Sequence, residues 1–437
     1  MHSASLIHWF REAAPFINAH RGQTIVVYLG GDAVASGGSE TLLHDLALIS
    51  ALGVRVVVVH GTRPQVTAHL HRTGAEDRYH GGLRVTDSEA LQAVKEAAGA
   101  TRVMIESVLS RGIASTLNVR KGVKVASGNF VVARPIGIRD GIDFQYTGEV
   151  RRIDAPAIND MLDFGTMVLI SPLGYSATGE VFNLNARDTA VAVAVALHAG
   201  KLLILAEDEI ADPQGHETVR QLTVREASDL LPRLPPDGAA AYALTGAIQA
   251  CQRGVQRAHI VQYEEDGAVV RELFTRDGSG TMVSVSPFDL LREATIDDVA
   301  GILALIEPLE REGILVRRSR EKLEQEIEHF AVLVREGTII ACGALYPFAS
   351  EKAGEIACIA VHEDYRKAGF GDALLARLQS EARSLGLGRV FVLTTHAIHW
   401  FIERGFERAA TDQLPGAKQA LYNYQRNSQV LIKNLGN

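Results

Sequence analysis

The stretch EIACIAVHEDYRKAGFGDALLARLQSEAR (355–383) decides the fold of the last third of the chain. It contains an apolar strand, a short loop RKAGFG (366–371) and an amphipathic helix, in that order. Glycines at 369 and 371 let backbone N–H groups approach a ligand, and the N-terminus of a helix carries about half a positive charge. Together with Arg366, these features predict a cradle for a diphosphate.

A glycine after a strand more often marks only a turn, so the loop alone is a weak signal. The flanks strengthen it, because a second strand, RVFVLTT (389–395), and a helix ending in WFIERGF (400–406) follow in order. This arrangement resembles the GNAT acetyltransferase superfamily. The resemblance implies that acetyl-CoA lies where two parallel strands splay apart, along the backbone of the first strand. The residues that it implicates are Cys358, Ile359, Ala360, Val361, Arg366, Lys367, Ala368, Gly369, Phe370 and Gly371.

The sequence around this stretch predicts a mixed α+β domain. Upstream, LREATIDDVAGILALIEPLEREG (291–313) predicts a strand and then an amphipathic helix. The other predicted strands are 331–335, 338–346, 354–361, 390–395 and 428–435, and the other predicted helices are 319–328, 370–385 and 397–403. A composition shift at SVSPFD (284–289) indicates a joint, so we expect a linker at 285–290 and the α+β domain at 291–437.

The first 284 residues show a different pattern, in which aliphatic runs alternate with helical stretches. The runs TIVVYLGG (24–31), VRVVVVHG (54–61) and GTMVLISPLG (165–174) are typical of a parallel sheet buried on both faces. Helices are predicted at 3–19, 39–52, 64–73, 87–98, 186–199 and 240–254. We therefore expect an α/β domain at 1–284, folded as a three-layer sandwich. Glycine-punctuated alternation in 120–152 predicts an antiparallel sheet over the C-terminal edge of the main sheet.

Size and charge limit what the chain can do. With 437 residues, 47% of them hydrophobic, it is long enough for at least two folded domains. A net charge of -8 without a basic tail argues against nucleic acid or an anionic membrane as a partner. The N-terminus fits neither a secretory signal nor a membrane span, so we expect a cytoplasmic protein with small-molecule partners. The three cysteines lack metal-type spacing, and we expect no metal site and no disulfide.

Five blocks of the first domain, in order, resemble the amino acid kinase family, and N-acetylglutamate kinases most closely. The blocks are FREAAPFINAHRGQTIVVYLGG (10–31), VVVVHGTRPQV (56–66), GLRVTD (82–87), FNLNARD (182–188) and ELFTRDGSGTMV (272–283). A domain of this kind fused to a GNAT domain resembles the bacterial N-acetylglutamate synthase family, and the joint resemblance covers nearly the whole chain. It implies an amino-acid N-acetyltransferase that transfers acetyl from acetyl-CoA to the α-amine of L-glutamate, the first step of arginine biosynthesis.

The chain departs from the kinase family at positions that would handle phosphate. Tyr28 stands where the family has a lysine, and Thr62 and Arg63 stand where it has glycines. A third lysine is missing from LTGAIQACQ (244–252). Phosphoryl transfer needs positive charge aimed at the phosphoryl group, so we expect an inactive kinase domain unless Arg63 replaces the lost lysine. The alternative is an active N-acetylglutamate kinase with an added acetyltransferase.

Glutamate offers two carboxylates, and arginine binds a carboxylate well in a two-bond geometry. The resemblance implies that Arg318, Arg426 and Ser428 bind the substrate. Arg317 and Arg320 are alternatives in the same basic segment as Arg318, where any one arginine is often only solvated.

The resemblance also implies the two catalytic groups. Glu355 is the expected base that removes a proton from the amine, and Thr394 is the expected proton donor to the leaving sulfur. The alternative for Glu355 is a structural pair with a lysine such as Lys352. Tyr422 and Tyr424 are alternative proton donors.

The block HIVQYEEDGAVVRELFTRDGSGTMV (259–283) resembles the segment with which arginine-sensitive kinases of this family bind L-arginine. The resemblance implicates Glu272, Gly278 and, from the N-terminal helix, Phe16. The alternative is that Glu272 caps a strand or pairs with Arg271 or Arg276. One face of the N-terminal helix is apolar, so we expect a homo-oligomer, and the resemblance suggests a hexamer. A further alternative is an arginine-sensing GNAT enzyme that acts on another amine.

Overall fold

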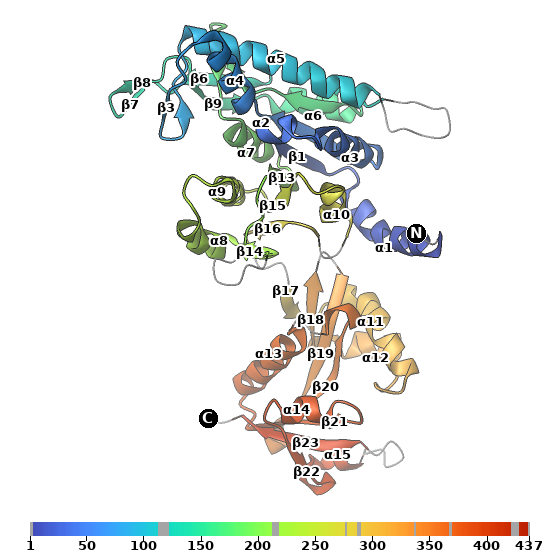
Figure 1. Cartoon of the computed structure of the whole chain (residues 1–437). Helices are drawn as coiled ribbons and strands as arrows, with labels where there is room; N and C mark the ends of the chain where they lie inside the picture. The colour runs from blue at the N-terminus through green and yellow to red at the C-terminus, as the bar shows by residue number, and fades with distance from the viewer. Residues whose placement is uncertain are drawn as a thin grey trace. The chain divides into compact units, whose positions relative to one another are not determined.

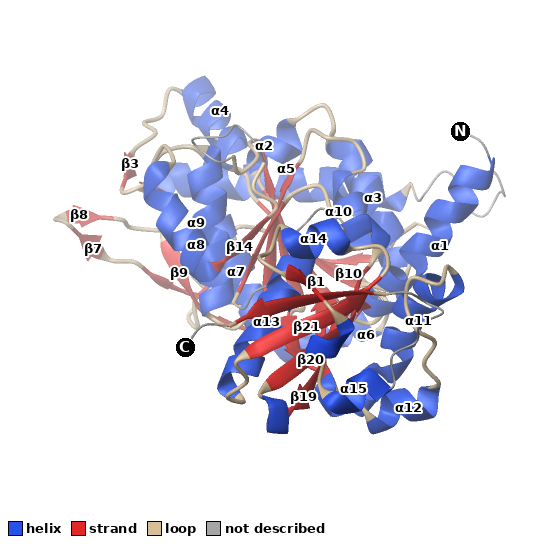
Figure 2. Cartoon of the chain, turned by 90° about the horizontal axis from the view of Figure 1, so that it is seen from below, coloured by secondary structure: helices blue, strands red, loops and turns tan. Residues whose placement is uncertain are grey.

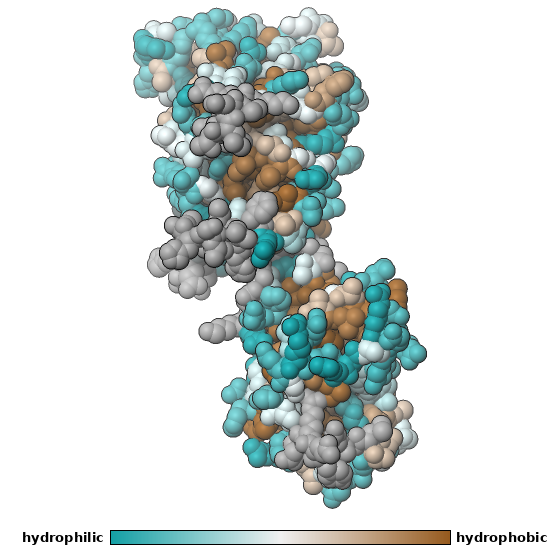
Figure 3. Space-filling view, turned by 90° about the vertical axis from the view of Figure 1, so that its right-hand side faces the viewer, coloured by the Kyte–Doolittle hydropathy of each residue, from teal (hydrophilic) through white to brown (hydrophobic). Residues whose placement is uncertain are grey.

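The computed structural model of the chain divides into two compact units, Met1–Pro287 and Phe288–Asn437. The residues that the structure describes are 3–111, 122–211, 218–275, 278–285, 290–335, 338–366, 369–420 and 428–435. Figure 1 shows the course of the chain through both units. No helix in these ranges is long and apolar enough to cross a membrane. In the space-filling view, polar side chains cover much of the visible face, with apolar patches between them (Figure 3).

The first unit is built on an eight-stranded sheet in the order β14-β16-β15-β13-β1-β2-β10-β5. All neighbouring strands run parallel except β15 and β16. The strands are β1 (Thr24–Leu29), β2 (Arg55–His60), β5 (Val125–Ala126), β10 (Met167–Ile170), β13 (Lys201–Ala206), β14 (Gln221–Thr223), β15 (Arg257–Gln262) and β16 (Thr281–Ser284). Because Ile25 and Val27 pack into one apolar core and Val26 into another, β1 is buried on both faces.

Helices cover both faces of this sheet, as the aliphatic runs predict. One core receives side chains from α6 (Ala155–Asp163), α7 (Ala186–Ala196), α8 (Val224–Leu230) and α9 (Ala239–Gln252). The other receives them from α1 (Ser3–His20), α2 (Gly31–Ala35), α3 (Ser39–Ala51), α5 (Ser88–Ser110) and α10 (Ala268–Phe274). The helix predicted at 87–98 continues to Ser110 as α5, and α4 (Arg63–Thr73) packs against it.

The aliphatic run at 165–174 contributes β10 to the buried parallel sheet, as expected, but its last residues form a second strand in another sheet. Ser171 and Pro172 separate β10 from β11 (Leu173–Tyr175), and proline has no N–H with which to continue a ladder. β11 belongs to the four-stranded sheet β12-β11-β6-β9, whose other members are β6 (Val131–Pro135), β9 (Gly148–Ile153) and β12 (Val181–Asn183). Most of its pairs are antiparallel, as 120–152 predicts, and it carries the hairpin of β7 (Ile138–Arg139) and β8 (Ile142–Asp143). A short pair, β3 (Tyr79–His80) and β4 (Leu83–Arg84), lies outside both sheets.

The second unit is a seven-stranded sheet in the order β17-β18-β19-β20-β21-β23-β22, in which only β20 and β21 are parallel neighbours. The strands are β17 (Leu290–Glu293), β18 (Phe330–Arg335), β19 (Thr338–Phe348), β20 (Ala353–Val361), β21 (Arg389–Thr394), β22 (Glu407–Ala409) and β23 (Gln429–Asn434). The sequence patterns do not predict β22, which has only three residues.

Helices lie on both sides of the second sheet. α13 (Phe370–Ser384) packs on one face, and α11 (Val299–Arg311) and α12 (Arg320–Gln325) pack on the other. Figure 2 shows β19, β20 and β21 side by side, with α13 and α12 flanking them. Two short helices, α14 (Ile398–Ile402) and α15 (Gly416–Ala420), precede the last strand. The helix predicted at 319–328 is shorter than expected, because α12 ends at Gln325 and a single 3-10 turn follows.

Candidate active site

The parallel strands β20 and β21 pair over only part of their length. The register joins Ala353 to Arg389 and Glu355 to Phe391, and no pairing follows within the described residues. Beyond that point β21 pairs only with β23, while β20 continues along β19 to Val361. The edge of β20 that faces β21 is therefore open over Cys358–Val361, the segment expected to contact acetyl-CoA.

A β-bulge at Cys358 lies where the strands separate. Gly343 of β19 faces two residues of β20, since the register passes from Cys342–Ala360 to Ala344–Ala357. Cys358 has a φ of 55°, in the left-handed region that a side chain rarely adopts. Such a bulge bends its strand and so turns β20 away from β21.

The bulge places two consecutive residues on the same face of the sheet. Cys358 packs with Ala344, the register partner of Ala357, in the core under α11 and α12. The residue that follows, Ile359, packs toward α13 instead. Cys358 is buried, as expected for an apolar core residue. A hydrogen bond from Cys342 lowers the pKa of the Cys358 thiol against the effect of burial, and the charge of Arg318 adds to the lowering.

The start of α13 has the form that a diphosphate cradle needs. Gly369 precedes the helix with a φ of 78°, and a side chain at Gly371 would lie 3.1 Å from Trp400. The 15 residues of α13 align their peptide dipoles toward this end. Arg366 and Phe370 border the loop, whereas Lys367 and Ala368 lie outside the described residues.

Glu355 is buried and has one charged partner in the described part of the chain. Its Oε2 lies 2.7 Å from Nζ of Lys418 in α15, and the side chains of the two are 9% and 24% exposed. The alternative of a pair between Glu355 and a lysine therefore agrees with this contact, although the lysine is Lys418 and not Lys352, which ends the turn between β19 and β20. The Glu355 carboxylate is thus held at the last pair of β20 and β21 by a side chain that solvent still reaches.

Arg318 lies beside the same strands, in the loop between α11 and α12. Its backbone N–H donates to Glu310, 2.9 Å away, and its guanidinium donates to the Val316 carbonyl at 3.2 Å. Burial alone would lower the pKa of Arg318, but the neighbouring Cys358, Tyr346 and Glu326 raise it. Of the three arginines in this segment, Arg318 is the one directed to the open strands, because Arg317 is exposed and Arg320 pairs with Glu324.

Tyr346 links Arg318 to Glu355. It is the register partner of Glu355 on β19, so both side chains leave the sheet on one face. Its hydroxyl donates to Glu326 at 2.7 Å, and burial together with this bond raises its pKa. Arg318, Tyr346, Glu355 and Lys418 therefore form a row of polar groups across β19 and β20. In such a row, Arg318 and Lys418 can bind a carboxylate, and Glu355 can accept a proton.

Thr394 and Ser428 lie at adjoining strand ends. Thr394 is the last residue of β21 and pairs with Gln429, which directly follows Ser428. The Thr394 hydroxyl oxygen accepts the Ala397 N–H at 3.0 Å, which fixes the oxygen and leaves its proton available. The hydroxyl of Thr395 is buried without a partner among the described residues, so it is a second candidate donor. Arg426, Tyr422 and Tyr424 lie outside the described residues.

In the first unit, Glu272 is held by three donors. His259 Nδ1 lies 2.5 Å from Oε1, and the backbone N–H groups of Ser279 and Gly280 donate to Oε2 at 2.7 and 2.8 Å. Against the effect of burial, these contacts lower the pKa of Glu272 from 4.5 to about 2. These contacts fit the alternative in which Glu272 caps a strand, because Ser279 and Gly280 directly precede β16. The alternative pairing with Arg271 is wrong, because Arg271 pairs with Glu265, and Arg276 lies outside the described residues.

Of the other two residues expected at the effector site, Gly278 lies next to this carboxylate and Phe16 packs in the core under the same helix. Gly278 has a φ of 64°, and a side chain there would meet the Glu272 carboxylate 2.5 Å away. Phe16 packs in the same core as Phe274 of α10, the helix that carries Glu272. The structure therefore brings Phe16, Glu272 and Gly278 to one part of the unit.

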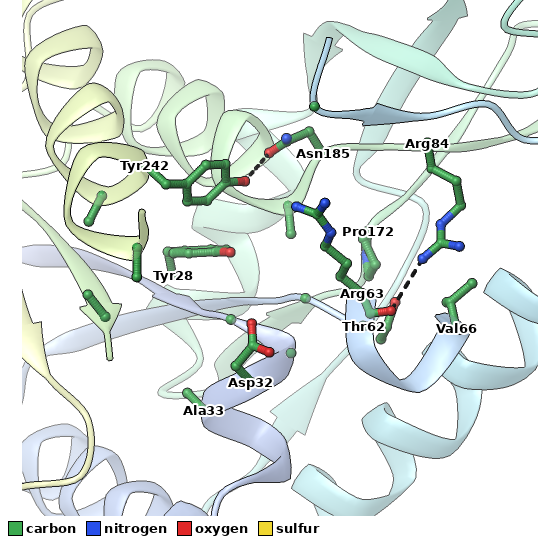
Figure 4. A pocket seen from close by; sticks show the side chains of 18 of the residues that line it. Tyr28, Asp32, Ala33, Thr62, Arg63, Val66, Arg84, Pro172, Asn185 and Tyr242 are labelled. Carbon is green, nitrogen blue, oxygen red and sulfur yellow. Dashed lines mark hydrogen bonds between the residues drawn. The ribbon is translucent and has the colours of Figure 1, made fainter. Parts of the chain in front are cut away.

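A cavity of about 410 Å³ lies in the first unit at the C-terminal ends of β1, β2 and β13 (Figure 4). Tyr28 forms part of its wall, and the Tyr242 hydroxyl donates to Asn185 Oδ1 at 3.0 Å. Burial and the nearby Tyr242 raise the pKa of Tyr28 well above its usual value. None of the described residues that line the cavity is a lysine.

Sequence reasoning missed Lys418, Tyr346 and His259. Lys418 lies 63 positions after Glu355, in a five-residue helix that has no periodic pattern. A signal existed for Tyr346, since a hairpin of β19 and β20 pairs it with Glu355 once the register is known. His259 and Glu272 are 13 positions apart on a strand and the following helix, and only the fold joins them.

Comparison with known proteins gives matches to both units. The model described as "Amino acid kinase family" matches residues 23–262, and the model described as "Acetyltransferase (GNAT) family" matches residues 299–407. The "Amino-acid acetyltransferase" of Pseudomonas syringae pv. syringae is 51% identical over 428 residues, which cover 98% of this chain and 99% of the relative. The protein of the same description from Pseudomonas putida is 51% identical over 430 residues, with the same shares.

Solved structures match along the whole length as well. N-acetylglutamate synthase from Neisseria gonorrhoeae complexed with coenzyme A and L-arginine is 37% identical, with a TM-score of 0.92 and 99% of both chains covered. The structure of that synthase with coenzyme A and N-acetyl-glutamate has a TM-score of 0.63 at the same identity and coverage. The predicted fold, a kinase-like α/β sandwich followed by a GNAT domain, is confirmed.

Proposed function

The chain belongs to the amino-acid acetyltransferase family, and we propose that it transfers the acetyl group of acetyl-CoA to the α-amine of L-glutamate. The products are N-acetyl-L-glutamate and coenzyme A, and the reaction begins arginine biosynthesis. The observation that carries this proposal is the buried Glu355 at the point where β20 and β21 separate, with Arg318 on the same face. The 37% identical synthase of known structure binds coenzyme A and N-acetyl-glutamate, which supports the same substrates here.

In the proposed mechanism, acetyl-CoA lies along the open edge of β20 with its diphosphate at the start of α13. The amine nitrogen of glutamate attacks the thioester carbonyl, a new C–N bond forms, and the C–S bond breaks. Glu355 takes a proton from the amine nitrogen, the leaving sulfur takes one from Thr394, and the proton held by Glu355 returns through solvent to the Thr394 oxygen. A thiol with a pKa of ~8.5 leaves readily as its thiolate. The proton from Thr394 should therefore contribute less to the rate than the base does.

Substrate binding in this proposal depends on charge. Arg318 holds one carboxylate of glutamate, and Arg426 with Ser428 holds the other, so that the amine faces Glu355. The support for Arg318 is its guanidinium beside Cys358 and Tyr346. Aspartate, with a shorter side chain, should not reach both positions.

The test is release of the coenzyme A thiol with a panel of amines. The rate should depend on L-glutamate, with aspartate much slower and with lysine and spermidine inactive. Equal rates with lysine or spermidine would falsify the assignment of glutamate. They would favour the alternative of an arginine-sensing GNAT enzyme that acts on another amine.

We also propose that the first unit, 1–284, has no kinase activity. The support is the cavity at the ends of β1 and β2, where Tyr28 replaces a lysine and no described lining residue supplies another. Transfer of the γ-phosphoryl group of ATP to a carboxylate, which gives an acyl phosphate and ADP, would then lack the lysine charges that stabilise its transition state in the kinases. A coupled assay for ADP with ATP, Mg²⁺ and N-acetyl-L-glutamate decides the matter, and ADP formation would restore the alternative of an active kinase.

We further propose that L-arginine binds this unit near Phe16, Glu272 and Gly278 and inhibits the acetyltransferase. Three of about four lone-pair positions on the Glu272 carboxylate are occupied, which leaves one on Oε1 for a guanidinium. The related synthase of known structure binds L-arginine, which supports an effector of this kind. Calorimetry should show arginine binding that Glu272→Gln weakens, and unchanged binding and inhibition would remove Glu272 from the site.

We propose as well that the chain forms a homo-oligomer, a hexamer by the family resemblance. Ala13 in the middle of α1 is buried in its own unit, and Trp9 on the same helix is 40% exposed. An exposed aromatic ring on a terminal helix is typical of a subunit contact. Light scattering of the full chain should give six times the mass of 47.2 kDa.

A further inference from the structure

The hydroxyl of Tyr346 joins an arginine and a glutamate that lie at the two ends of one short helix. Arg318 comes before α12, and Glu326 directly follows it. The Tyr346 hydroxyl donates to Glu326 Oε2 at 2.7 Å. Burial and this bond raise the pKa of Tyr346, whereas the charge of Arg318 and a hydrogen bond from it act in the opposite direction. The single oxygen of Tyr346 thus donates to a carboxylate and accepts from a guanidinium.

The fold fixes the position of this hydroxyl more firmly than that of either partner. Tyr346 belongs to β19, a strand with a neighbour on each side, and its ring packs against that of His329 with the centroids 5.1 Å apart. Arg318 lies in the loop between two helices, and Glu326 ends the shorter of them, where it also approaches Lys322 at 3.8 Å. Tyr346 is therefore the fixed member of the three groups, and the two charged side chains adjust to it.

Arg318 is near a carboxylate but does not pair with it. In the described part of the chain, no ion pair joins its guanidinium to an acidic side chain, and it donates instead to the Val316 carbonyl at 3.2 Å. Burial lowers the pKa of Arg318, and the charge of Glu326 is among the effects that raise it, so this carboxylate lies nearby. An arginine and a carboxylate bind most strongly in a direct two-bond pair. Such a pair between Arg318 and Glu326 would neutralise the guanidinium before a substrate reached it.

We propose that Tyr346 is a positioning residue that keeps Glu326 from pairing directly with Arg318 and so leaves the guanidinium available to a carboxylate of the substrate. This inference rests on the proposed function, in which the substrate is L-glutamate. A tyrosine hydroxyl suits the task, because it can satisfy Glu326 as a donor and Arg318 as an acceptor at the same time. Without the hydroxyl, the two charges would be left partly buried with a lost partner each, and a direct pair would relieve both.

The test combines steady-state thiol release with a second substitution in the full chain. Tyr346→Phe should raise the Michaelis constant for glutamate by roughly 10- to 100-fold, because the substrate must now displace Glu326 from Arg318. The constant for acetyl-CoA should stay the same. Adding Glu326→Gln to Tyr346→Phe should return the constant for glutamate to within about threefold of wild type, because the competing charge is gone. Glu328→Gln is the matched control, since Glu328 is an exposed glutamate two residues further on, and it should restore nothing.

A crystal structure of the Tyr346→Phe variant tests the same inference without reference to the substrate, and it should show Arg318 and Glu326 in a direct ion pair. The proposal is overturned if Tyr346→Phe leaves the Michaelis constant for glutamate unchanged, or if Glu326→Gln does not restore it. It is also overturned if the variant structure leaves the two charged side chains apart. If wild-type protein shows no glutamate-dependent thiol release, the proposed function fails, and the variant structure alone still decides the role of Tyr346.

Discussion

Two buried glutamates, one in each unit, are held in different ways. In the first unit, Glu272 accepts hydrogen bonds from an imidazole and from two backbone N–H groups, all of which the fold fixes in place. In the second unit, Glu355 contacts a single lysine on a five-residue helix, and that lysine is 24% exposed. Glu272 is thus left with about one lone-pair position for a ligand, whereas Glu355 has only Lys418 as a partner among the described residues. Burial alone does not show how much of a carboxylate is free to bind.

The largest expected effect is at Glu355. Glu355→Gln keeps the shape of the side chain but removes the base, so turnover should fall by roughly 10² to 10⁴ while coenzyme A binding is retained. The measurement is steady-state thiol release, with binding of coenzyme A followed separately. Glu407→Gln, an exposed glutamate on β22 of the same sheet, is the control. Near-normal turnover of Glu355→Gln between pH 7 and 8 would assign the base elsewhere and end the contrast with Glu272.

A second effect should appear in substrate affinity. Arg318→Ala removes one proposed partner of a glutamate carboxylate, a loss of ~2 to 5 kcal/mol, so the Michaelis constant for glutamate should rise about 30-fold or more. The constant for acetyl-CoA should stay the same. Arg317→Ala is the matched control, since Arg317 is the exposed neighbour. If the two variants behave alike, Arg318 is only a surface charge.

The third effect concerns stability in the first unit. The Glu272 pKa is about 2 instead of 4.5, which at about 1.4 kcal/mol per pH unit gives about 3 kcal/mol of stabilisation. A depressed acid pKa stabilises the fold above pH 4.5, and the contribution disappears as the pH falls toward 2. Glu272→Gln should therefore speed hydrogen exchange at the Ser279 and Gly280 amides at pH 7.

The control for this prediction is Glu265→Gln, because Glu265 is a half-exposed partner of Arg271 on the same segment. It should leave the Ser279 and Gly280 amides protected. Wild-type protein should lose protection at these two amides between pH 4 and pH 2. If Glu272→Gln protects the two amides as well as wild-type protein does, their hydrogen bonds do not depend on the carboxylate charge.

The smallest effect should be at Lys418. In the proposed site its ammonium competes with the substrate amine for Glu355, and a partly exposed pair contributes about 1 kcal/mol or less. Lys418→Met should thus lower the Michaelis constant for glutamate by up to about fivefold, while Lys418→Arg keeps it near wild type. Lys352→Met is the control on the neighbouring turn. A rise of more than tenfold would instead make Lys418 a ligand of the substrate carboxylate.

The sequence predicted more of the elements than of their contacts. Apolar periodicity located β20, α13 and the aliphatic strands of the first unit, because those signals are local. The partner of Glu355 was not predictable in this way, since α15 carries no periodic pattern and approaches β20 only through the fold. The left-handed backbone at Cys358 could not be predicted either, because a cysteine in the sequence does not indicate a positive φ. Arg318 was one of three candidates until the structure placed it beside Tyr346.

The bulge in β20 has a genetic consequence. Ala357 and Cys358 share one face, so removing the single codon for Cys358 would leave Ile356, Ala357, Ile359 and Ala360 on the faces that they occupy now. Such a deletion would straighten the strand and allow β20 to continue its ladder with β21. An ordinary closed sheet is thus one codon away from a sheet with an opening between β20 and β21. A strand that tolerates many substitutions can therefore be intolerant of a change in length.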